Sequence, residues 1–187
     1  TAVGTDALTA NTTGTQNVAV GANALDGVSS DSDNVAVGYS ALGGASLGCG
    51  QNIGIGTNVL TNATTGNGRN VGVGYKALEA NTTGSENTGM GWQALMDNTT
   101  GYANTGLGRN ALKSTTTGYN NVAVGFNALE NNTTAMDSVA VGKDALRYNT
   151  TGVNNCAVGS NTLDACTTGT QNTAVGNSAG HAITTGG

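Results

Sequence analysis

The sequence predicts an all-β fold, a parallel β-solenoid (β-roll) of eleven coils. A variant of N-V-A-V-G-x-N-A-L-x-x-N-T-T-G-x-x recurs eleven times in 187 residues, at intervals of 17 or 18 residues. A unit this short cannot enclose a core of its own, so each copy is expected to be one coil that buries its apolar residues against its neighbours. Collagen is excluded, because the chain has no proline and its glycines do not fall at every third residue.

The coils are counted on the glycine that ends the apolar tetrad, which we number repeat position 5. We predict one repeat domain over residues 1–187, a segment of a longer fibre, because the sequence begins and ends inside a repeat. Two adjacent intervals have 18 residues, and both place the extra residue in the same turn, within residues 48–52 and 66–70. The eleven anchor glycines are Gly4, Gly21, Gly38, Gly56, Gly74, Gly91, Gly108, Gly125, Gly142, Gly159 and Gly176.

Repeat positions 2 to 4 are expected to form a short strand. Position 4 is apolar in every copy and position 2 is Val, Ile, Thr or Cys, which are residue types that suit a pleated strand. Position 9 is leucine in ten copies and is expected to fill a narrow core inside each coil.

Position 3, between the two larger strand residues, is only ever Ala or Gly. A strand with one solvated face would carry polar residues on that face, so we expect both faces to be packed, one on the leucine core and one on a partner chain. The pattern leaves open which face meets the partner. We take the small residues as the trimer-packing candidates: Ala19, Ala36, Gly54, Gly72, Gly89, Gly106, Ala123, Ala140 and Ala157.

The remaining repeat positions indicate turns. Glycine at position 5, and usually at position 15, is expected to supply backbone angles that other residues resist. Asparagine at position 1 is expected to form a ladder of side-chain amides from coil to coil. The position-1 asparagines are Asn17, Asn34, Asn52, Asn70, Asn87, Asn104, Asn121, Asn155 and Asn172.

Composition and charge exclude several function classes. Formal net charge is −5 and the six Lys and Arg residues are scattered, so no basic stripe for nucleic acid exists. No apolar run is long enough for membrane insertion. Cys49, Cys156 and Cys166 do not recur with the repeat, so we expect free thiols and neither a metal nor a cofactor. Asp31 and Asp33 could hold a cation, but we favour an exposed acidic turn without an ion.

Enzymatic activity is not expected. His181 is the only histidine and lies in the last coil, and no carboxylate pair recurs with the repeat.

The tetrad N-V-A-V-G followed by x-N-A-L resembles the head repeat of trimeric autotransporter adhesins. The longer form, with A-L-x-x-N-T-T-G between tetrads, is similar to repeats of viral and phage tail fibres, and the resemblance covers the whole chain. It implies a left-handed parallel β-roll, assembled as a homotrimer of three chains side by side. It also implies an extracellular location, on a virion fibre or a bacterial cell surface.

The function we expect is a structural and recognition segment of a trimeric viral tail fibre or surface adhesin, which projects and contacts a host-surface glycan or protein receptor. The alternative is the head of a bacterial trimeric autotransporter adhesin. The receptor-contact candidates are the large residues at position 6, although they could instead seal the contact between chains. They are Tyr39, Tyr75, Trp92, Arg109, Phe126 and Lys143.

An ice-binding β-solenoid is a further alternative, because Thr-Thr recurs in nine coils, from Thr12-Thr13 to Thr184-Thr185. We rank it lower, since neighbouring residues on a strand point to opposite sides and only one threonine column would then face outward.

Overall fold

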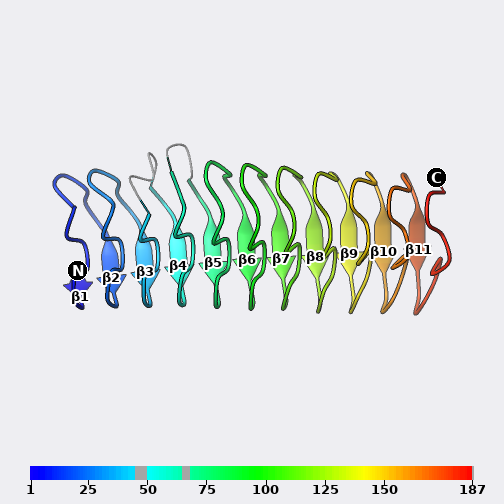
Figure 1. Cartoon of the computed structure of the whole chain (residues 1–187), viewed down its shortest axis with the longest axis horizontal. Helices are drawn as coiled ribbons and strands as arrows, with labels where there is room; N and C mark the ends of the chain where they lie inside the picture. The colour runs from blue at the N-terminus through cyan, green and yellow to red at the C-terminus, as the bar shows by residue number, and fades with distance from the viewer. Residues whose placement is uncertain (45–49, 65–67, 187) are drawn as a thin grey trace.

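The computed structural model describes residues 1–44, 50–64 and 68–186. These residues contain no helix, and their eleven strands form one parallel sheet in chain order (Figure 1). The predicted all-β parallel solenoid is therefore confirmed. The strands are β1 (Ala2–Val3), β2 (Val18–Val20), β3 (Val35–Val37), β4 (Ile53–Ile55), β5 (Val71–Val73), β6 (Thr88–Met90), β7 (Thr105–Leu107), β8 (Val122–Val124), β9 (Val139–Val141), β10 (Cys156–Val158) and β11 (Thr173–Val175).

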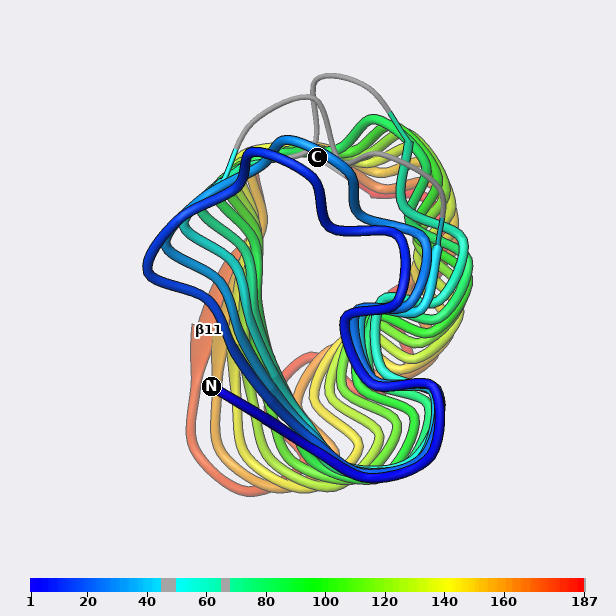
Figure 2. The same cartoon turned by 90° about the vertical axis from the view of Figure 1, so that its left-hand side faces the viewer.

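Each coil stacks on the next with identical repeat positions in register. Gly106 of β7 pairs with Ala123 of β8, and Ala123 pairs with Ala140 of β9. Viewed along the axis, successive coils repeat a similar outline, each displaced a little from the one before (Figure 2). Register is kept from β3 through β5, so the extra residues of the 18-residue intervals are absorbed outside the strands. The turns expected to hold them include residues 48–49 and 66–67, which lie outside the described residues.

The small residues at position 3 point into the coil's own core. Ala123 is fully buried within the single chain and belongs to the leucine-containing core cluster. A Cβ added at Gly106 would lie 3.1 Å from the carbonyl oxygen of Ala111 and 3.5 Å from Leu95 Cγ, which form the opposite wall of the solenoid. Position 3 is therefore small because that wall lies so close.

The assignment of position 3 to a chain–chain contact is thus wrong, since buried residues of one chain cannot meet another. The correction applies to Ala19, Ala36, Gly54, Gly72, Gly89, Gly106, Ala123, Ala140 and Ala157.

The position-9 leucines fill the core, as the sequence predicts. Leu112 is fully buried, and it has a φ of 54°, in the left-handed region that non-glycine residues rarely enter. Asn110 at position 7 and Asn120 at position 17 share this region, with φ of 57° and 55°. The left-handed backbone costs a leucine about 1–2 kcal/mol, which burial of its side chain offsets with about 1.5–3 kcal/mol.

The two glycine columns share one constraint, since a Cβ on Gly101 or on Gly108 would collide with backbone of the next coil, but they differ in φ. Gly108 at position 5 has a φ of 136°, a conformation that favours glycine, so the prediction for this column is confirmed. Gly101 at position 15 is not in that region, so the explanation by φ is wrong for this column. A Cβ on Gly101 would instead collide with the carbonyl oxygen of Gly118 in the next coil.

The predicted asparagine ladder at position 1 is confirmed. The side chain of Asn104 donates from Nδ2 to Asn87 Oδ1 (3.2 Å) and to the Gly118 carbonyl (2.8 Å). Its Oδ1 accepts from the backbone N–H and the Nδ2 of Asn121, at 3.0 and 3.1 Å. Because Asn104 is fully buried, this ladder replaces water for the polar groups of each turn.

A second buried amide column at position 12 was not anticipated. Asn98 donates to Asn81 Oδ1 at 3.1 Å and to the Gly101 carbonyl at 3.0 Å. Its signal in the sequence is the asparagine of the N-T-T-G motif, a position that the repeat pattern places among the turns. The fully buried members of this column are Asn81, Asn98, Asn132 and Asn149.

Candidate functional site

The outward side chains of the sheet form one continuous uncharged surface, which we call the outer sheet face. It consists of repeat positions 2 and 4, and no Asp, Glu, Lys or Arg occurs there in any coil. Ile55 and Met90 are 40% and 44% exposed. The sequence pattern leaves undecided which of the two strand faces points outward. In the structure the outward face is the one formed by positions 2 and 4. Its members in strands β6 to β8 are Thr88, Met90, Thr105, Leu107, Val122 and Val124.

The receptor-contact candidates lie in one exposed column, at position 6. Five of them follow one another in consecutive coils, and we call these the aromatic–cationic strip: Tyr75, Trp92, Arg109, Phe126 and Lys143. Tyr39 is separated from the strip by Thr57, which occupies position 6 of the intervening coil.

Neighbouring members of the aromatic–cationic strip contact one another across coils. The ring centroids of Tyr75 and Trp92 lie 4.5 Å apart with planes tilted by 33°. The Arg109 guanidinium lies 5.6 Å from the centroid of Phe126, in cation–π geometry. Trp92 and Arg109 together line a surface hollow of about 270 Å³. The strip is therefore an ordered surface that combines ring faces with positive charge.

Most cations near the strip are paired with carboxylates. Lys143 Nζ lies 3.4 Å from Asp144, and Arg147 Nε lies 2.8 Å from Glu130 Oε2. Lys76 is bound to Glu79, whose hydrogen bond raises the pKa of Lys76. Among the described residues, Arg109 and Lys113 are the Lys and Arg side chains with no carboxylate within 4.0 Å.

Asp97, near Lys113, is electrostatically unfavourable at neutral pH. Burial raises the pKa of Asp97, and the nearby charge of Lys113 opposes this only in part. Because the folded-state pKa lies above the unfolded value, the stabilising contribution exists at low pH and is lost as pH rises through the folded pKa. At pH 7 the ionised carboxylate therefore costs stability.

We expect Asp97→Asn to raise the free energy of unfolding at pH 7 by about 0.5–1.5 kcal/mol. Asn131, at the same repeat position, donates from Nδ2 to the Arg147 carbonyl of the next coil at 3.1 Å, and the new amide should bond the Lys113 carbonyl likewise. The gain should shrink below pH 4, where aspartic acid is protonated. Urea unfolding at pH 7 and below pH 4 measures the gain in the free energy of unfolding. A gain of the same size at the two pH values would contradict the cost of burying the ionised carboxylate.

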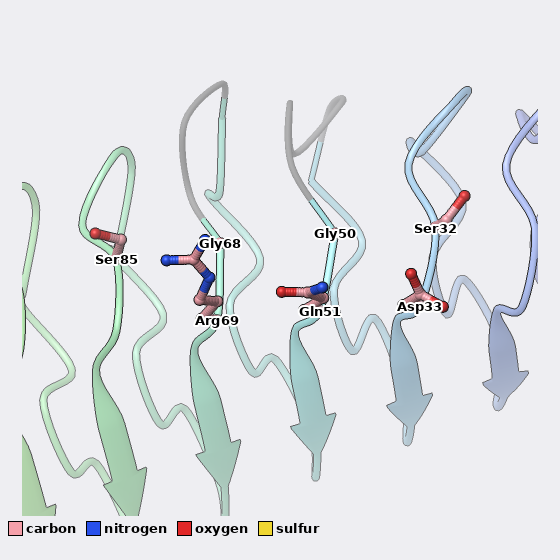
Figure 3. A pocket seen from close by; sticks show the side chains of 7 residues that line it. All are labelled: Ser32, Asp33, Gly50, Gln51, Gly68, Arg69 and Ser85. Atoms are coloured by element: carbon pink, nitrogen blue, oxygen red, sulfur yellow. The ribbon is translucent and has the colours of Figure 1, made fainter.

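A second exposed column, at position 16, changes character along the rod. Tyr102 and Tyr119 stack with centroids 4.8 Å apart and planes at 5°. In the earlier coils the residues at this position are small, and a hollow of about 480 Å³ lies beside them (Figure 3). The hollow is lined by Ser32, Asp33, Gly50, Gln51, Gly68, Arg69 and Ser85.

The prediction of an exposed acidic turn beside this hollow is correct for Asp33 and wrong for Asp31. Asp33 is exposed and lines the hollow, whereas Asp31 is only 8% exposed, and its carbonyl accepts a hydrogen bond from Asn17 Nδ2 at 2.7 Å. Within residues 1–44, 50–64 and 68–186, no group of three or more His, Cys, Asp or Glu could hold a metal ion.

The threonine columns occupy bends and not strands, so our reason for expecting a single outward column is wrong. Thr116 at position 13 is half-buried, and its hydroxyl donates to the Thr133 carbonyl of the next coil at 3.1 Å. Thr117 at position 14 is exposed. Since the position-13 hydroxyls bond within the solenoid, the ordered hydroxyl surface is limited to position 14.

The described cysteines are free thiols, as expected. Cys156 is half-buried on the outer sheet face, and Cys166 is buried inside a coil, where burial raises the pKa of its thiol. Cys49 lies outside the described residues. His181 pairs with Asp164 at the last coil.

Fold and surface together define a parallel β-solenoid with one uncovered sheet face and one aromatic–cationic strip. No family model, no curated protein and no solved structure matches the chain. In the part of the chain that the structure describes, no helix is long and apolar enough to cross a membrane.

Proposed function

We propose that this chain is a structural and recognition segment of a homotrimeric fibre or adhesin, exposed on a virion or a bacterial surface. The observation that carries the proposal is the outer sheet face, which is uncharged along all eleven strands. Contiguous apolar patches above a few hundred Å² usually mark interaction sites. At about 4.8 Å per strand the face is on the order of 50 Å long, so a contact on it can extend along the whole rod.

The partner that fits this face is another copy of the chain. Its side chains recur at the strand spacing in every coil, so a second solenoid with the same repeat can match them along the whole rod. Each chain carries a formal charge of −5, yet no charged residue stands on the face, so like charges do not meet at the contact. Three copies follow from the resemblance to trimeric adhesin heads, where chains lie side by side.

Recognition is assigned to the aromatic–cationic strip, whose residues follow the anchor glycine and lie outside the strands. Trp92 is 50% exposed, although a large apolar side chain gains from burial. Exposed rings in contact with one another, beside a guanidinium that has no carboxylate partner, are an arrangement that suits a binding partner.

The purified chain should have the molar mass of three copies by light scattering, and Val124→Lys should convert it to a monomer. Val124 lies on the outer sheet face, so an ammonium there would be buried without a partner, at a cost of several kcal/mol. Thr117→Lys adds the same charge at an exposed position 14 and should stay trimeric. A monomeric wild type would refute the assembly, and a trimeric Val124→Lys protein would refute the assigned face.

The thiol of Cys156 gives a second measurement of the same contact. In a Cys49→Ser background, the trimer should protect Cys156 from a maleimide reagent, because β10 carries it on the outer sheet face. The Val124→Lys monomer should react faster. Cys166, which is buried in the coil, should stay unreactive in both proteins.

A further inference from the structure

We propose that Trp92 and Arg109, at the centre of the aromatic–cationic strip, bind a sugar ring that carries a carboxylate. This inference rests on the recognition role proposed above and names the ligand class for that site. Three observations carry it: an unpaired guanidinium, exposed ring faces beside it, and a local charge that suits one anionic group at a time.

The guanidinium of Arg109 is available for an external anion. It has no carboxylate within 4.0 Å among the described residues, and its described side-chain contact is the ring of Phe126, 5.6 Å away. Among the described residues no hydrogen bond uses its N–H donors, so they are available to an external group. These donors form a fork that matches the two oxygens of a carboxylate.

Trp92 provides the apolar half of the site. It lines the same 270 Å³ hollow as Arg109, and the 2.9 Å bond from the Asn110 N–H to the Trp92 carbonyl holds the two coils together beside it. Contact with Tyr75 on the other side orders the indole. The exposed indole can pack on the C–H face of a sugar ring while its N–H stays available to a hydroxyl, since tryptophan combines an apolar body with one polar group.

The charge around the site excludes a dense polyanion. Lys143 is compensated by Asp144 and Arg147 by Glu130, so two positive charges without an ion pair remain, on Arg109 and Lys113. Nucleic acid binding requires neutralisation of many phosphates, and the chain's net charge of −5 opposes it. A sugar ring with a single carboxylate fits this site, because one guanidinium pairs with one carboxylate.

The test uses the fluorescence of Trp92, which is the only tryptophan of the chain. The probes are galacturonate, tetragalacturonate and the methyl ester of the tetramer, which is neutral. We expect a saturable change with tetragalacturonate and about tenfold weaker binding of its ester, because a charge-assisted hydrogen bond is lost. A response to galacturonate as strong as to the tetramer would identify a single acidic sugar as the ligand, whereas a stronger response to the tetramer would identify a polymer.

Arg109→Gln should weaken tetragalacturonate binding about tenfold and remove the preference over the ester. Tyr102→Ala removes a stacked ring of the other exposed column and should leave binding unchanged. Equal affinity for acid and ester in the wild type, no saturable change with any probe, or tighter binding of a single-stranded oligonucleotide would each overturn the inference. Molar mass is measured on the same samples: a trimer that binds none of these sugars refutes the ligand alone, and a monomer that binds them refutes the assembly alone.

Discussion

Asn104→Asp is expected to lower the free energy of unfolding by about 3–5 kcal/mol at pH 7. The substitution keeps the shape of the side chain but replaces the Nδ2 donor by an oxygen. That oxygen would face two acceptors, Asn87 Oδ1 and the Gly118 carbonyl. It would also place a charge where the side chain has 0% exposure, and a buried charge without a partner is strongly unfavourable.

The midpoint of urea unfolding measures this loss. Asn177→Asp is the matched control, because Asn177 is exposed and its Oδ1 accepts a hydrogen bond from Ser178 that a carboxylate can also accept. The loss should diminish below about pH 4, where a protonated carboxyl can donate again to the Gly118 carbonyl. Equal midpoints for Asn104→Asp and the control would contradict the role of the ladder.

Ala123→Leu is expected to destabilise the fold by about 1–3 kcal/mol and to leave the molar mass unchanged. Ala123 is fully buried in the cluster that contains Leu112 and Leu129. A larger side chain there would force the two walls of the coil apart. Thermal and urea unfolding report the destabilisation, and light scattering reports the mass.

Val124→Leu is the control for added volume on the same strand. Val124 lies on the outer sheet face, and Leu107 already occupies its repeat position in the neighbouring strand, so the unfolding midpoint should change little. An Ala123→Leu protein that melts like the wild type but loses its assembly would overturn the inward orientation of position 3.

Much of the fold follows from the repeat itself. A 17-residue period leaves a coil no way to bury Leu112 except against the same residue above and below, so stacking and register were predictable. The ladder of Asn104 and its equivalents was predictable for the same reason, because identical amides at one spacing bond one another. The alignment of Trp92 and Arg109 in one column was also predictable, because both occupy repeat position 6.

Other features depend on distances that a repeat does not contain. Gly101 and Gly108 look alike in the sequence, and both lie too close to the next coil for a Cβ, but only Gly108 also has a φ that favours glycine, at 136°. Asn98 stands in a polar motif that predicts a turn. Its side chain is nevertheless buried and donates hydrogen bonds to Asn81 and to the Gly101 carbonyl. Thr116 and Thr117 lie in bends, where the alternation of a strand does not apply.

The repeat alone predicts that this protein is a stack of similar coils, since only stacking gives so short a unit a core. The direction in which each strand faces depends instead on the packing of the folded coil. Alternation shows that Ala123 and Val124 lie on opposite sides of the strand, but the side that faces inward depends on how close the opposite wall lies. That wall leaves room only for Ala or Gly, so the larger residues form the outer sheet face.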